Sequence, residues 1–198
     1  MTISEESCSI LDIPLVKCDR DTWQGSLSLE AWAHYGGALG ETFPQKIEGP
    51  PILYIRCLAE KAPIDYLGKQ SAALQYLQDH QQAIESDVLL GIWRVVVECD
   101  WDAYTDAIAV EDAMVPWEAL AEKANSPTEQ DLQTMKSVMM LSTVTVFPGN
   151  ESVPVQLILS FECAWDPDHG LEVLIEQGTV KEIDVVGGLE ACEWLSLL

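Results

Sequence analysis

The stretch that decides the fold is VMMLSTVTVF at residues 138–147, followed by VPVQLILSFEC at residues 153–163. Both runs are rich in β-branched and other apolar residues, which favour strands. Pro148-Gly149-Asn150 lies between them and has the composition of a turn. We therefore expect two neighbouring antiparallel strands here.

The same pattern continues toward the C-terminus. LEVLIE at residues 171–176 and TVKEIDVV at residues 179–186 flank Gln177-Gly178, which predicts a second hairpin. Toward the N-terminus, residues 10–17, 22–29 and 52–58 read as strands, and Pro14 makes the first of these irregular or an edge strand.

The middle of the chain is helical in pattern. Residues 70–80 place apolar side chains at helical spacing, and a second helix begins at Ser86 or Asp87 and runs to about Asp102. Ser126-Pro127-Thr128-Glu129 matches a capping box and opens a short helix to about Lys136.

The order of strands, then helices, then strands predicts an α+β fold with an antiparallel sheet and helices packed on one face. The length of 198 residues is consistent with one domain, residues 1–198. The acidic segment 103–125 is the candidate for a flexible or partner-facing stretch, or it is only a connecting arm.

The net charge of the chain limits the classes of partner that we expect it to bind. The formal net charge is −23, and residues 98–198 hold twenty acids against three bases. Phosphate binding depends on Lys and Arg, so we expect neither a nucleic-acid partner nor an anionic membrane partner. A field of this sign attracts cationic partners, although acidity can also serve solubility alone.

The N-terminus does not resemble a signal peptide, and no run approaches the length of a membrane helix, so we expect a soluble, cytoplasmic protein. The six cysteines show no metal-site spacing. In a reducing compartment they are expected to be free thiols that are mostly buried.

An acidic surface is the first candidate site. Ten acids lie between residues 98 and 131, opposed only by Lys123, and two tryptophans are interspersed with them. Such a surface could be merely solvated, or it could bind a basic protein with the tryptophans as apolar anchors. The predicted partner surface consists of Asp100, Trp101, Asp102, Asp106, Glu111, Asp112, Trp117 and Glu118.

The second candidate is a tight turn between two predicted strands, Trp165-Asp166-Pro167-Asp168-His169-Gly170. Its aspartates can bond the turn's own amides, and Gly170 permits a positive φ, so a structural turn is the simpler interpretation. The same atoms, with Cys163, could instead bind a metal or do acid–base chemistry. No cofactor or nucleotide fingerprint is present, and we predict no cofactor, no metal and no catalytic residues.

The turn also carries a resemblance. With Cys163 and Gly187 it resembles a bacterial family of uncharacterised domains that carry C-x-W-D-x-E-H-G near the C-terminus, with Asp168 in place of the commoner Glu. Trp23-x-Gly25 and a helical pattern at residues 70–77 match more loosely, so the resemblance spans roughly residues 22–188. Members look like proteins found beside polymorphic toxin genes, which implies an immunity protein.

Together these observations predict a non-catalytic, protein-binding module, an immunity protein that neutralises a basic, nuclease-type toxin domain by occlusion. The alternatives are a metal-assisted hydrolase centred on Asp166, Asp168 and His169, and a housekeeping protein whose acidity serves solubility.

Overall fold

The computed structural model describes residues 7–19, 21–37, 50–56, 67–108, 122–149 and 154–189. Its centre is an eight-stranded sheet whose strands follow one another in chain order from β1 to β8. Every neighbouring pair is antiparallel except β4–β5, which is parallel. The strands are β1 (Ser7–Ile10), β2 (Ile13–Lys17), β3 (Thr22–Ser26), β4 (Ile52–Arg56), β5 (Met139–Phe147), β6 (Gln156–Cys163), β7 (Asp166–Glu176) and β8 (Thr179–Val185).

Strands β5 to β8 form the expected meander. Alternation of their side chains divides the sheet into two faces. Val144, Leu159 and Val173 point to one face and belong to the main hydrophobic core, while Ile158 and Leu174 belong to a smaller cluster on the other. This meander confirms the strand predictions at 138–147, 153–163, 171–176 and 179–186.

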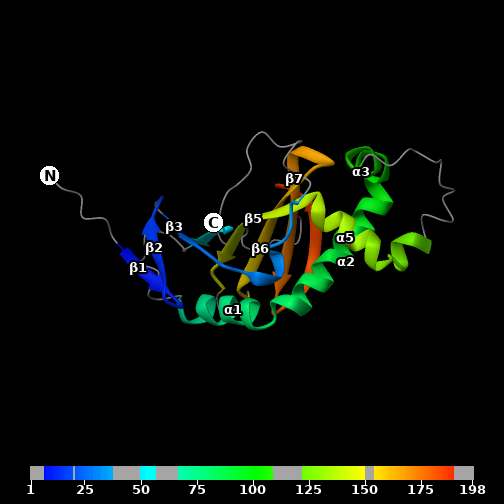
Figure 1. Cartoon of the computed structure of the whole chain (residues 1–198). Coiled ribbons are helices and arrows are strands. Elements are labelled where there is room, and N and C mark those ends of the chain that lie inside the picture. Colours follow the sequence, from blue (N-terminus) through cyan, green and yellow to red (C-terminus); the bar gives the residue numbers. More distant parts are fainter. Residues whose placement is uncertain are drawn as a thin grey trace.

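The helices cover one face of the sheet, as expected for the α+β class (Figure 1). They are the 3-10 turn η1 (Glu30–Trp32), α1 (Leu67–Asp79), α2 (Gln81–Cys99), α3 (Trp101–Ala107) and α5 (Glu129–Ser137). All but η1 lie between β4 and β5 in the chain, and a long connection of this kind is what a parallel pair requires. Gly91 allows α2 to approach β8 closely, because a Cβ there would lie 2.5 Å from Ile183 Cδ1.

Two boundaries differ from the predictions. Residues 10–17 are not one strand but the end of β1, a turn and β2, because Leu11 and Asp12 adopt positive φ angles of 47° and 63°. Apolar residues lie on both sides of this two-residue turn, so the sequence pattern predicted one continuous strand. Helix α2 begins at Gln81, so Ser86 and Asp87 lie inside it and do not cap it.

The capping box of α5 also lies two residues later than predicted. Thr128, not Ser126, is the N-cap, and its side chain accepts a hydrogen bond from the Asp131 amide. The Asp131 carboxylate in turn accepts from the Thr128 amide at 2.9 Å. Asp131 therefore takes the place that the sequence pattern assigned to Glu129.

Replacing Thr128 with alanine should lower the free energy of unfolding by about 1 kcal/mol, because a helix amide loses its partner. The matched control is Ser126→Ala, which removes a hydroxyl from an exposed residue two positions away. Urea denaturation of both variants measures the difference. A larger loss in Ser126→Ala would place the cap where the sequence pattern put it.

Cysteine burial is only partly as expected. Cys163 is buried, but Cys18 and Cys99 are exposed free thiols, so the prediction of mostly buried cysteines is wrong for these two. Both lie at the ends of elements: Cys18 directly follows β2, and Cys99 is the last residue of α2. Within the described part of the chain, no helix has the length and apolar character needed to cross a membrane.

Candidate functional site

The predicted partner surface is described in part. Asp100 is half-buried at the junction of α2 and α3, and Asp102 and Asp106 are exposed on α3. Trp101 is the first residue of α3. Glu111, Asp112, Trp117 and Glu118 lie outside the described residues. Of the segment 103–125, residues 103–107 belong to α3 and residues 122–125 form a helical turn.

The predicted motif turn is a hairpin with a bulged strand. Cys163 pairs with Asp166, so the turn itself is Ala164-Trp165, and the next pair is Phe161 with Leu171. Residues 167–170 of β7 therefore stand opposite the single residue Glu162 of β6. The predicted hairpin is present, but its turn is shorter than expected, because residues 166–170 already belong to β7. Residues 167–169 of the bulge are exposed.

Two contacts organise this bulge. The Asp166 carboxylate accepts a hydrogen bond from the His169 amide at 3.3 Å and lies 2.9 Å from His169 Nδ1. Gly170 adopts φ +69°, and a Cβ at this position would lie 2.3 Å from the Phe161 carbonyl oxygen. His169 and Asp168 are exposed, so the polar side of the motif faces solvent.

The fold brings the two predicted sites together through an aromatic stack. The ring of Tyr104 on α3 packs edge-on against Trp165 at 5.5 Å and against Trp93 of α2 at 5.9 Å. In Figure 1 the start of β7 accordingly lies beside α3. All three aromatic residues are buried. Only Trp165 had been singled out from the sequence; the apolar pattern of α2 and α3 did not show that Trp93 and Tyr104 would meet it.

As a result, α3 and the β6–β7 turn, which both carry carboxylates, lie against each other. We call Asp100, Asp102, Asp106, Asp166 and Asp168 the acidic end. Burial raises the pKa of Asp100 above its usual 3.8, and the negative charge of Asp166 raises it further.

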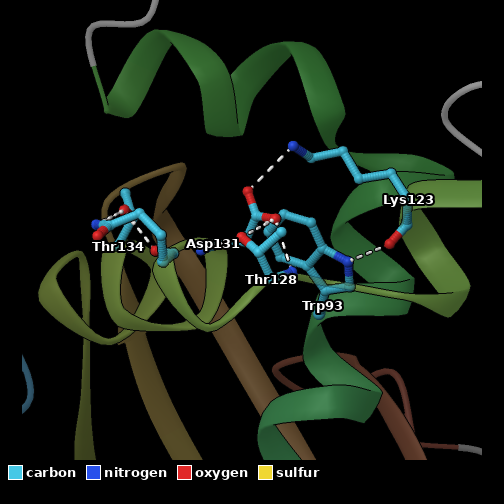
Figure 2. Close-up of polar contacts among 6 residues, drawn as sticks. Trp93, Lys123, Thr128, Asp131 and Thr134 are labelled. Carbon is cyan, nitrogen blue, oxygen red and sulfur yellow. Dashed lines mark hydrogen bonds and ion pairs between the residues drawn. The ribbon is translucent and has the colours of Figure 1, made fainter.

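Lys123, the lysine closest in sequence to α3, already contacts residues outside the acidic end. Figure 2 shows that Lys123 contacts both Trp93 and Asp131: its carbonyl accepts a hydrogen bond from Trp93 Nε1 at 2.9 Å, and its ammonium lies 3.0 Å from the Asp131 carboxylate. Burial alone would raise the pKa of Asp131, but hydrogen bonds from Thr128 and the contact with Lys123 lower it. Lys136 is likewise paired, 2.6 Å from Glu85. These lysines neutralise carboxylates outside the acidic end.

The positions of Cys163, Asp166 and His169 give little support to the metal-binding alternative. Cys163 is fully buried, and its burial and the Asp166 charge raise the pKa of its thiol, which disfavours the thiolate that binds metals. Among the described residues, no three His, Cys, Asp or Glu side chains are grouped so that they could hold a metal ion. The Asp166–His169 contact is the feature on which acid–base chemistry could still be based.

Comparison with known proteins identifies a family. A protein-family model described as a domain of unknown function covers residues 59–189. The match includes all elements from α1 to β8 and therefore the whole acidic end, but it does not include Trp23 and Gly25. No curated protein and no solved structure matches the chain.

Proposed function

The chain belongs to the DUF6985 family, a domain of unknown function, and from the geometry of its acidic end we propose that it is a non-catalytic module that binds a basic protein. The most specific form of this proposal is an immunity protein that occludes the cationic site of a nuclease-type toxin. The observation that supports it is the packing of Tyr104 of α3 against Trp165, which brings the helix with exposed Asp102 and Asp106 next to the bulge with exposed Asp168.

Charge complementarity is the physical basis of the proposal. Carboxylates on a rigid surface accelerate the encounter with a basic partner and select against acidic ones. A nuclease needs a cationic site because its substrate is anionic. Asp102 and Asp106 are exposed on α3, and the aromatic stack beneath holds that helix in place, so little ordering is needed on binding.

The test is affinity capture from the native host with the full chain as bait. We expect a basic protein that is retained at low salt and released at high salt. The triple variant Asp100→Lys, Asp102→Lys, Asp106→Lys should reduce its capture by about 100-fold or more, because like charges now face each other.

The matched control carries the same change of charge elsewhere. Glu30, Asp79 and Asp87 are exposed and lie in η1, at the end of α1 and in the first half of α2. Their replacement by lysine should leave capture within about threefold of the unmodified chain. If both triple variants captured equally less partner, the loss would follow from net charge alone. That result would contradict the proposed surface. An empty capture, with stoichiometric metal in the purified protein, would favour the hydrolase.

A further inference from the structure

The sheet has a second face, here called the back face, on which none of the described helices packs (Figure 1). Strand pairing places Tyr54, Thr145, Ile158 and Leu174 side by side across β4 to β7, and paired residues of neighbouring strands point to the same face. We call these four residues the back row. Leu174 is 0% exposed and Ile158 is 6% exposed, although their cluster contains no residue of a described helix. Other parts of the chain therefore cover this end of the back row.

The chain turns onto the back face directly after β8. Gly187 adopts φ +83°, and the Gly188 amide donates to the Val185 carbonyl at 2.8 Å, which closes a tight turn. The Gly187 amide also donates to the Glu172 carboxylate at 3.0 Å. Glu172 lies two residues before Leu174 on β7, so its side chain points to the back face as well. These bonds direct the chain back across β7.

Leu189, the last described residue, reaches the back row. It packs with Phe147, Ile158 and Leu174 and is itself only 8% exposed. A leucine that packs onto a sheet from outside keeps its outer side in water unless further chain lies over it. The burial of Leu189 therefore requires more cover at this place, and residues 190–198 follow it directly.

Residues 190–198, EACEWLSLL, lie outside the described residues, but their sequence suits this role. Ala191, Trp194, Leu195 and Leu198 recur at i, i+3, i+4 and i+7, the spacing that places apolar side chains on one face of a helix. The segment thus offers one apolar side to the back row.

Charge gives the direction in which the segment crosses the sheet. Glu182 pairs with Leu174 and Asp184 pairs with Glu172, so the back face is acidic over β7 and β8. The back row carries no charge on β4 and β5. Residues 190–198 contain two glutamates and no base, so repulsion favours a path away from β8 and toward β5 and β4.

We propose that residues 190–198 form a strap that continues from Leu189 across the back row toward β5 and β4 and seals the back face of the sheet. Trp194 anchors the strap over Thr145 and Tyr54. When the strap is displaced, the apolar cluster of Phe147, Ile158 and Leu174 becomes open to water. The strap involves no residue of the acidic end and does not depend on the proposed partner.

Photo-cross-linking of the full chain tests where the strap lies. In the variant Trp194→p-benzoylphenylalanine, irradiation and mass spectrometry should identify cross-links within one chain to peptides that contain back-row residues. The same probe at Val185 is the control: this exposed residue pairs with Leu171 of the main core, so it points to the opposite face and should not cross-link to those peptides. Cross-links to the helices, cross-links only between two chains, or no cross-links would each overturn the strap.

A second test compares two variants that add the same charge at adjacent positions. Leu195→Asp places a carboxylate on the apolar side of the strap, whereas Ser196→Asp falls outside that side. Leu195→Asp should raise the fluorescence of the apolar dye ANS by about threefold or more, because the back row becomes accessible, and Ser196→Asp should leave it unchanged. An equal rise in both variants, or no rise in Leu195→Asp, contradicts the strap. Unchanged far-ultraviolet circular dichroism shows that both variants are folded.

Discussion

Replacing Gly170 with alanine should lower the free energy of unfolding by roughly 3 kcal/mol or more, the range of severe backbone conflicts. Gly170 adopts φ +69°, where side chains are strained, and its new Cβ would lie 2.3 Å from the Phe161 carbonyl oxygen. That oxygen belongs to the backbone of β6 and cannot move aside without disturbing the β6–β7 ladder. Urea denaturation, followed by circular dichroism, measures the loss.

Gly187→Ala distinguishes the cost of the positive φ from the cost of the close contact with the Phe161 carbonyl oxygen. Gly187 also has a positive φ, of 83°, but a Cβ there would meet no atom within 4 Å. It should therefore show only the conformational cost, about 1 kcal/mol. If the two alanine variants lose equal stability, the close approach at Gly170 contributes nothing and the bulge is more adaptable than its geometry indicates.

The second large effect is expected at the centre of the aromatic stack. Tyr104→Ala should lower the free energy of unfolding by about 3 to 4 kcal/mol, because it leaves a cavity between two buried tryptophans and removes two edge-on ring contacts. Tryptophan fluorescence should also shift to longer wavelength as water reaches Trp93 and Trp165. Thermal and urea denaturation give the loss of stability.

Tyr76→Ala is the matched control, since it removes the same side chain from a position that is 43% exposed. Tyr76 stacks on His80 at 4.0 Å and covers Gly178, so a loss of about 1 kcal/mol is expected. A loss in Tyr104→Ala no greater than in Tyr76→Ala would show that the stack does not hold α3. In that case the acidic end would lack the rigid support assumed for partner binding.

The family match covers a defined part of the fold. The matched residues 59–189 include the stack, the bulge and the helices above them, whereas β1 to β4 precede the match. The acidic end thus belongs entirely to the part of the chain that defines the family. Its toxin-related function is a proposal and is decided by the capture experiment.

Local sequence was sufficient for the class of fold and for most elements. The β-branched runs predicted β5, β6 and β8, Gln177-Gly178 predicted the last hairpin, and helical spacing predicted α1 and α2. These features depend on neighbours in the chain, because strand alternation and turn conformation are set by residues a few positions apart. Where two local signals overlapped, as with Ser126 and Thr128 at the start of α5, the pattern alone chose the wrong residue.

The acidic charge of the second half and the motif of residues 165–170 were likewise evident from the sequence. Only the tertiary structure placed Tyr104 between Trp93 and Trp165, and with it α3 against the β6–β7 turn. These residues lie in α2, α3 and the β6–β7 turn, and they meet because the helices pack across a sheet whose strands come from both ends of the chain. Contacts between such distant segments follow from the packing of whole elements, which no local pattern records.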